Sequence, residues 1–491
     1  SSAASDVYKR QYVVRDYFDV FDEVYCPKEH TFEFLQNVLT EVMELFPSHY
    51  IHIGGDECPK KAWKKCAHCQ HLMKWEGLPN EEALQSWFIH RIEQFVNSKG
   101  RDIIGWDEIL EGGLAPNATV MSWRGEKGGI EAARQRHKVI MTPGKKCYLD
   151  YYQESPEFAP LAIGGFLPLD TVYNYNPLPA ELTPEEQAYM IGVQANIWGE
   201  YIQTPEYFEY MAFPRLLAMS EVQWTQPEHK DFESFARRLD KEFERLDYCG
   251  VNACRNFYEV NQAGAWNKSQ QTYEVTLNTF CPDADIYYAV NDSTVNTSSS
   301  LYETPIPLDE DATIYSAVYR SGKPLGKVTR KSFAVNKATG CDYTCNPEAG
   351  WEHLNKGFGL TDGRRGYARD MRRWISFYQD TVQIVVELKK PQKVKEVAFS
   401  SLWRPVNEIW PARAMGVSVS MDGQTFIPVG TKRLTYDFSL TEGTRFPASL
   451  SFAETEATFV RLELLSGGLC PKGYFHEGLQ SELAIDEIEI Y

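Results

Sequence analysis

Two kinds of apolar pattern alternate along the chain between about residue 31 and residue 246. In residues 31–46 and 81–98, apolar side chains recur at every third or fourth position, which predicts amphipathic helices. Between such stretches lie short continuous apolar runs bounded by turn residues, which are typical of buried strands. The pattern predicts strands at 50–54, 101–106, 119–123, 138–142 and 191–198, and further helices at about 129–136, 205–222 and 231–246.

The alternation of strands with helices predicts a parallel sheet built from βα units. Each predicted strand leads into a Trp, Tyr, Asp or Glu residue. A (β/α)8 barrel gathers its functional residues at the carboxyl ends of its strands, whereas a doubly wound sheet concentrates them at one switch point. Contributions from five strand ends favour the barrel. Because eight strands close such a barrel, we expect a partial (β/α)8 TIM barrel, with about five of eight units present and the first units missing from this chain.

The rest of the chain has the short alternating runs of antiparallel β-structure. Runs between residues 270 and 336 predict a small β-sandwich. Further runs predict a second β-rich module, with strands at 381–388, 394–400, 415–420, 458–465 and 484–491. The expected fold class is therefore α/β plus all-β, with domains at residues 1–255, 268–337 and 346–491.

Composition narrows the class of function. The net charge is −18, and no cluster of Lys and Arg carries interleaved aromatic residues, so we expect no nucleic-acid partner. No apolar run reaches the length that spans a membrane. The 12 Trp and 28 Tyr residues suit the stacking of flat, partly apolar ligands such as sugar rings, although much of this content can be core.

The 11 cysteines are odd in number and include Cys66-Ala67-His68-Cys69, which has the spacing of a metal or redox site. No second pair of this kind follows, so a local disulfide, reduced thiols and a zinc knot all stay open. A structural role is favoured over a zinc-dependent enzyme. Cys341 and Cys345 could pair, but sequence cannot assign connectivity. We expect no cofactor and no metal in the functional site.

The most informative segment is His52-Ile53-Gly54-Gly55-Asp56-Glu57, which places two adjacent carboxylates directly after an apolar strand. The glycine pair permits a sharp turn and the close approach of another molecule. Neighbouring residues of an extended chain point to opposite sides, so Asp56 and Glu57 would address two parts of one ligand. This suits a reaction that needs one proton donor and one separate charged group that orients the substrate. A segment of this kind alone could be a solvated turn, and the downstream strand ends overturn that interpretation.

With those strand ends, the segment resembles glycoside hydrolase family 20, the exo-acting β-N-acetylhexosaminidases. The ordered set is far more specific than any one motif and comprises Trp106, Trp123, Tyr148-Leu149-Asp150 and Trp198-Gly199-Glu200. Residues 18–26 are similar to the loop before the fourth barrel unit of bacterial members. The first three barrel strands of the family carry a sugar-gripping arginine and an Asp/His pair, which have no counterpart here. The resemblance therefore implies an N-terminally truncated member.

The β-rich regions also resemble known modules. Residues 270–336 are similar to the chitobiase/hexosaminidase-type C-terminal module. Residues 346–491 resemble a discoidin-like, or coagulation factor type C, jelly roll, a fold often used to bind carbohydrate. Trp403 and Trp410 of this region are interpreted as packing residues.

The resemblance implies a retaining hydrolysis in which the substrate assists, with its 2-acetamido oxygen as the nucleophile and an oxazolinium intermediate. Glu57 would protonate the glycosidic oxygen and then take a proton from water. Asp56 would accept the acetamide N–H, and Tyr148 would donate its hydroxyl to the acetamide oxygen. Burial among aromatic residues would raise the pKa of Glu57 towards neutrality, as an acid of this kind needs.

Five further residues are expected to bind the substrate. The tryptophans would wall the acetamide methyl and stack on the ring, and the two carboxylates would accept hydrogen bonds from outer hydroxyls. The five are Trp106, Trp123, Trp198, Asp150 and Glu200. Asp107 and Glu108 are interpreted as supporting loop groups.

The implied activity is removal of terminal N-acetylglucosamine or N-acetylgalactosamine from the non-reducing ends of glycans, which are the expected partners. The alternative is an inactive fragment or a glycan-binding protein that lacks the first barrel strands. The class of substrate implies a periplasmic, cell-surface or secreted location.

Overall fold

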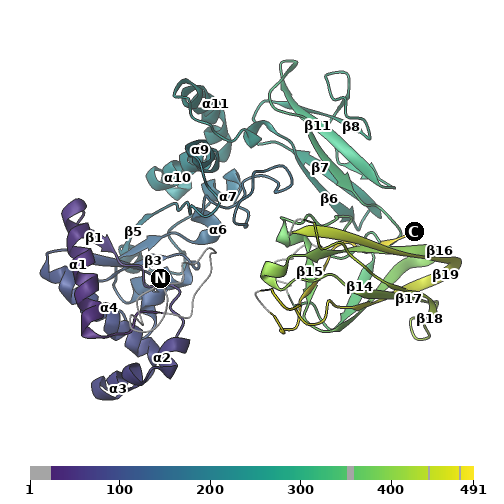
Figure 1. The fold of residues 1–491 in the computed structure, drawn as a ribbon. Coiled ribbons are helices and arrows are strands. Elements are labelled where there is room, and N and C mark those ends of the chain that lie inside the picture. The colour runs from purple at the N-terminus through teal and green to yellow at the C-terminus, as the bar shows by residue number, and fades with distance from the viewer. Residues whose placement is uncertain (1–23, 351–358, 441–442, 475–476) are drawn as a thin grey trace. The chain divides into compact units, whose positions relative to one another are not determined.

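The computed structural model describes residues 24–350, 359–440, 443–474 and 477–491. It divides the chain into two compact units (Figure 1). The first holds the described residues up to Gln153 together with Gly165–Phe235 and Phe243–Ala253. The second holds Glu154–Gly164, Ala236–Glu242 and Cys254–Tyr491. Most of the segment 18–26 lies outside the described residues.

The first unit is built on five parallel strands, as predicted. They are hydrogen-bonded in chain order, so each new strand adds to the same side of the sheet. Ile51 pairs with Ile103, and Val120 pairs with Val139. A sheet without reversal of strand order is wound like a barrel of βα units and has no switch point. The strands are β1 (Tyr50–His52), β2 (Asp102–Trp106), β3 (Thr119–Ser122), β4 (Val139–Met141) and β5 (Met190–Val193).

The long helices of this unit follow the apolar spacing. In α4 (Glu81–Ser98), the N-cap Asn80 accepts a hydrogen bond from the Ala83 N–H at 2.9 Å, and the helix packs against β2. Helix α5 (Lys127–Arg134) packs against β3 and β4. The other helices are α1 (Glu29–Leu45), α2 (Lys61–Lys65), α3 (Ala67–Glu76), α6 (Gly144–Cys147), α7 (Leu169–Tyr173), α8 (Pro184–Gln187), α9 (Pro205–Ala212), α10 (Arg215–Trp224) and α11 (Phe232–Tyr248).

Two predicted elements of the first unit were wrong in extent. The strand expected at 191–198 ends at Val193, because the following residues bond to the loop after β4 instead. There the Leu149 N–H donates to the Asn196 carbonyl at 2.7 Å, and the Asn196 N–H donates to the Cys147 carbonyl at 2.9 Å. The helix expected at 205–222 is divided into α9 and α10, because Pro214 has no N–H and its ring obstructs a continuous helix.

The second unit begins with two small antiparallel sheets. Tyr273, Val275 and Leu277 are buried in one sheet, and Ile314 and Val318 are buried in the other. One sheet has the order β10-β7-β6, and the other joins β8, β9, β11, β12 and β13. The strands are β6 (Asn261–Asn267), β7 (Thr272–Asn278), β8 (Asp285–Val290), β9 (Ser300–Leu301), β10 (Ile306–Leu308), β11 (Ala312–Arg320), β12 (Lys323–Pro324) and β13 (Thr329–Phe333).

An eight-stranded antiparallel sheet forms the rest of the second unit. The strands expected at 381–388 and 394–400 are one long strand, whose pairing is irregular between Glu387 and Gln392. Trp403 and Trp410 are buried in one apolar cluster, which confirms their role in packing. The strands are β14 (Asp342–Asn346), β15 (Ile375–Phe377), β16 (Thr381–Trp403), β17 (Ala414–Ser420), β18 (Ile427–Arg433), β19 (Thr444–Leu465), β20 (Leu483–Ile485) and β21 (Glu489–Ile490).

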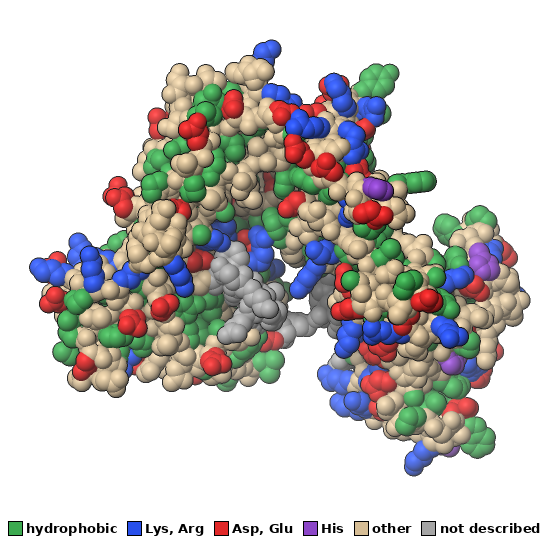
Figure 2. Space-filling model, turned by 180° about the vertical axis from the view of Figure 1, so that it is seen from behind, with side chains coloured by type: hydrophobic (Ala, Val, Ile, Leu, Met, Phe, Trp, Pro, Cys, Tyr) green, Lys and Arg blue, Asp and Glu red, His purple; other side chains and the backbone are tan. Residues whose placement is uncertain are grey.

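Charges of both signs are interspersed on the surface. Figure 2 shows Lys and Arg side chains among Asp and Glu side chains on one face, with hydrophobic side chains between them. Among the described helices, none is both long enough and apolar enough to cross a bilayer. The cysteines are free thiols, so Cys341 and Cys345 do not pair.

Candidate active site

A glycine turn at the carboxyl end of β1 carries the two adjacent carboxylates. Gly54 and Gly55 both have positive φ, at 74° and 89°. The Gly54 carbonyl accepts the Trp106 N–H at 2.9 Å, which holds the turn against the end of β2. A Cβ on Gly55 would lie 2.6 Å from Cγ2 of Ile109, so the turn requires glycine at this position.

Asp56 and Glu57 leave this turn with different environments. Asp56 is half-buried, and its pKa is raised, first by burial and then by the negative charge of Glu108. The Glu57 side chain is exposed, contrary to the burial expected for it, and its φ is 45°. A left-handed conformation costs a residue with a side chain on the order of 1 kcal/mol, and such strain clusters at functional sites.

The aromatic side chains predicted at four strand ends form a continuous series of ring contacts. Trp106 and Trp198 have ring centroids 5.8 Å apart, and Trp198 lies 6.1 Å from Tyr148. Tyr148 is nearly parallel to Trp123, with centroids 6.3 Å apart and an interplanar angle of 14°. The carboxyl ends of parallel strands share one edge of the sheet, which explains why residues so distant in sequence meet.

Tyr148 is held in place by the backbone around it. The backbone of Tyr148 forms an isolated parallel bridge with Asn196. At the start of the short helix that precedes Tyr148, the Gly144 N–H donates to the Trp123 carbonyl at 2.9 Å. Its side chain is 7% exposed, and burial raises the pKa of the phenol. The hydroxyl therefore keeps its proton at neutral pH and can donate a hydrogen bond.

Asp150 and Glu200 contain acceptor atoms that are buried without a partner. Asp150 is 3% exposed, and burial raises its pKa to about 6, with a further contribution from the charge of Glu200. Neither carboxylate oxygen of Asp150 has a well-aligned hydrogen-bond partner among the described residues, although the backbone N–H groups of Asp150 and Trp198 lie close enough to lower its pKa. Oε2 of Glu200 also has no well-aligned partner there. Buried carboxylates of this kind are suited to receive hydroxyl donors from a ligand.

Two arginines that the sequence pattern does not single out support the site. Arg215 is fully buried and donates to the carbonyls of Tyr151 at 3.0 Å and Leu167 at 2.9 Å. Its charge also lowers the pKa of Asp150, against the larger effect of burial. Arginine within an apolar helix is the signal that could have identified it, because such a residue is rarely buried without carbonyl or carboxylate partners.

The second arginine, Arg124, binds the acidic pair after β2. Its Nε lies 3.1 Å from Oδ1 of Asp107 and 3.8 Å from Oε2 of Glu108. Glu108 in turn accepts the Trp123 indole N–H at 2.9 Å. Burial raises the pKa of Asp107 to about 7, although Arg124 opposes the shift. Glu108 therefore fixes the Trp123 side chain, and Asp107 binds the Arg124 side chain that lies beside both carboxylates.

Comparison with known proteins finds matches to most of the first unit and to part of the second. Residues 2–227 match the catalytic domain of glycosyl hydrolase family 20, and residues 261–330 match the chitobiase/beta-hexosaminidase C-terminal domain. The beta-hexosaminidase of Porphyromonas gingivalis is 53% identical over 247 residues, which are 50% of this chain and 32% of that protein. The beta-hexosaminidase of Vibrio furnissii is 37% identical over 195 residues, 39% of this chain and 32% of that protein.

Solved structures are also similar to part of this chain in sequence, and one of them contains a bound sugar. The exo-beta-N-acetylglucosaminidase of Vibrio harveyi, in complex with N-acetylglucosamine, is 34% identical, with a TM-score of 0.41 over 46% of this chain and 36% of that one. The chain spans about a third of the length of the two curated relatives. Residues 2–227 are thus similar to the catalytic domain of glycosyl hydrolase family 20, and residues 261–330 are similar to the chitobiase/beta-hexosaminidase C-terminal domain.

Proposed function

We propose that the first unit belongs to a retaining exo-β-N-acetylhexosaminidase, which removes terminal N-acetylglucosamine or N-acetylgalactosamine from glycans. The observation that carries the proposal is the series of ring contacts Trp106–Trp198–Tyr148–Trp123 at the strand edge that also bears Asp56 and Glu57. We infer that the sheet is five strands of a (β/α)8 barrel and that its carboxyl edge is the sugar site.

In this proposal the substrate supplies its own nucleophile. The acetamido oxygen attacks the anomeric carbon as the bond to the leaving oxygen breaks, and Glu57 gives that oxygen a proton. Asp56 accepts the acetamide N–H and stabilises the positive charge of the oxazolinium. Water then attacks the anomeric carbon and opens the oxazolinium ring, while Glu57 takes a proton from that water. Two successive displacements at the same carbon retain the anomeric configuration.

The remaining side chains position the sugar. Tyr148 donates to the acetamide oxygen, because its phenol is protonated at neutral pH and burial raises its pKa further. The three tryptophans enclose the acetamide methyl and the ring, and the unpartnered oxygens of Asp150 and Glu200 accept the outer hydroxyls. We further propose that residues 346–491 are a discoidin-like module that binds glycan, and that the protein works in the periplasm, on the cell surface or outside the cell.

The decisive test is Glu57→Gln, assayed on N-acetyl-β-glucosaminides whose leaving groups differ in acidity. Loss of the general acid should lower turnover of a poor leaving group by roughly 10²–10⁴-fold and spare substrates with excellent leaving groups. Glu41→Gln, on an exposed position of α1, is the matched control and should leave turnover unchanged.

Two outcomes would contradict the proposal. Full activity of Glu57→Gln on the poor leaving group would remove Glu57 as the acid. Binding of a thiazoline inhibitor or glycan without any turnover by the unaltered chain would instead favour a glycan-binding protein.

A further inference from the structure

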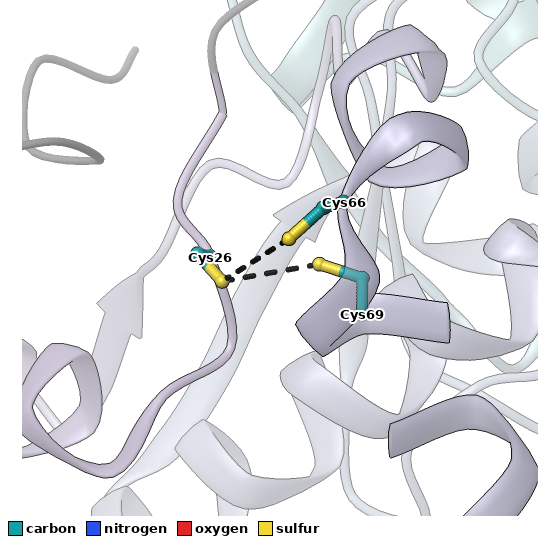
Figure 3. Close-up of side chains that lie close together, drawn as sticks. All are labelled: Cys26, Cys66 and Cys69. Carbon is teal, nitrogen blue, oxygen red and sulfur yellow. Dashed lines mark hydrogen bonds between the residues drawn. The ribbon is translucent and has the colours of Figure 1, made fainter. Parts of the chain in front are cut away.

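Three cysteines from separated parts of the first unit bring their sulfur atoms together (Figure 3). Cys26 Sγ lies 4.0 Å from Cys66 Sγ and 3.9 Å from Cys69 Sγ, and all three atoms lie within 4.8 Å of one another. A Zn–S bond of about 2.3 Å gives the thiolate tetrahedron an edge of roughly 3.8 Å. The sulfur atoms therefore stand at the separation of zinc ligands.

We propose that Cys26, Cys66 and Cys69 are three ligands of a structural zinc site. The sequence alone shows only the Cys66–Cys69 pair, and the structure supplies the third thiol from 40 residues before Cys66. The site is independent of the proposed sugar chemistry, because none of its ligands belongs to the residues assigned to the substrate.

The backbone on both sides of Cys26 is fixed to the helices that carry the other two thiols. The Trp63 indole N–H donates to the Tyr25 carbonyl at 3.0 Å, and Nε2 of His68 lies 3.3 Å from the Pro27 carbonyl. These contacts hold Cys26 from the residue before and the residue after it. The thiols are thus held in place before any metal enters.

The N-terminus of α3 favours thiolate ligands. Cys66 is the N-cap of this ten-residue helix, and Cys69 lies in its first turn. Partial positive charge at a helix N-terminus stabilises a thiolate, which is the form that binds zinc. On binding, the thiols release their protons to solvent.

A disulfide does not account for this geometry. A disulfide needs its sulfur atoms about 2.05 Å apart and joins only two of them. Here Cys26 stands at nearly equal distances from both other sulfur atoms, as ligands around one centre do. Within the described part of the chain no fourth Cys, His, Asp or Glu joins the group, so the three thiolates leave the fourth tetrahedral position to a solvent molecule.

The position of the site indicates its role. Cys69 is fully buried and Cys26 is 9% exposed, within a cluster that includes Trp63, Met73 and Leu84. A metal there would link the segment before α1 to helices α2 and α3. These two helices belong to the connection between β1 and α4, which continues directly after Glu57. Zinc would thereby stabilise the connection that follows the two carboxylates.

The test is the zinc content of the whole chain, purified and reconstituted with Zn²⁺ under reducing conditions. We expect about one zinc per chain, and loss of that zinc in Cys26→Ser and Cys69→Ser. Cys249→Ser removes an exposed thiol elsewhere in the unit and should keep the metal. Co²⁺ in place of zinc should give the thiolate charge-transfer and intense visible bands of a tetrahedral site.

A measurement on the unaltered chain keeps the proposal testable if the serine variants do not fold. Bound zinc should protect Cys26, Cys66 and Cys69 from alkylation while Cys249 reacts, and a chelator should abolish the protection. The proposal is overturned if the reconstituted chain holds no zinc. It is also overturned if two of these cysteines resist alkylation in the absence of metal and react only after reduction, as the two halves of a disulfide do.

Discussion

Two neighbouring side chains in the loop after β4 differ in proton occupancy at neutral pH, and burial raises the pKa of both. Tyr148 keeps its proton, because burial disfavours the phenolate. Asp150, whose pKa is about 6, is mostly ionised at pH 7 even though it is buried. One residue can therefore donate to a sugar and the other can accept from it.

Replacing Tyr148 with Phe tests the donor. Loss of one hydrogen bond to the developing charge should lower kcat by roughly 10²–10³-fold. Tyr50→Phe is the control, because that hydroxyl meets Lys138 Nζ at 2.8 Å at the start of β1. Equal turnover in Tyr148→Phe and the unaltered chain, measured on one aryl glycoside, would exclude Tyr148 from the reaction.

The pH dependence of Asp150→Asn tests the unpartnered carboxylate. Folding raises the pKa of Asp150 from 3.8 to about 6, so the folded state binds its proton more tightly than the unfolded state does. This contribution to stability is fully present below pH 3.8 and is lost as the pH rises through 6. The free energy of unfolding of the Asn variant, relative to the unaltered chain, should therefore rise by roughly 3 kcal/mol between about pH 4 and pH 8.

Urea unfolding would measure this difference at each pH, with hydrogen exchange in the peptides of β3 to β5 as the readout. The same substitution should raise KM for the sugar, because the amide is a weaker acceptor than the carboxylate. A difference in unfolding free energy that does not change with pH would show that Asp150 is not titrating near 6.

At the scale of elements, the glycine turn after β1 determines where the carboxylates stand. Gly55→Ala would place its Cβ 2.6 Å from Ile109 and impose an unfavourable positive φ. We expect losses in both activity and thermal stability. Gly100→Ala has a similar φ of 74° with no atom within 4 Å, so it should cost only about 1 kcal/mol and leave activity intact. Equal effects of the two substitutions in melting and activity assays would argue against a required close contact.

Elements with a strong local pattern could be predicted from sequence, and those defined by distant contacts could not. Helix α4 has its apolar period and its N-cap Asn80 in the chain itself, so its bounds follow from local chemistry. Strand β5 is shorter than its apolar run, because Asn196 bonds to the loop after β4. The aromatic series could be predicted from the inference that parallel strands end at one edge, together with the family resemblance of the ordered motifs.

For the whole molecule, the two units depend on long-range pairing to different degrees. In the first, each strand pairs with the next one in sequence, from β1 to β5. In the second, β16 pairs with β19 along most of its length and also with β14, β20 and β21. Loop closure for such distant partners slows folding, so the order of strands predicts a faster first unit.

That pairing has a consequence for synthesis on the ribosome. Val397 and Ala398 receive their partners Ile490 and Glu489 only after all the intervening residues have been translated. Until then the nascent β16 has open edges that can associate with other chains. A pause in translation between residues 403 and 483 would prolong this interval, and chaperone capture of the emerging strand would be most valuable there.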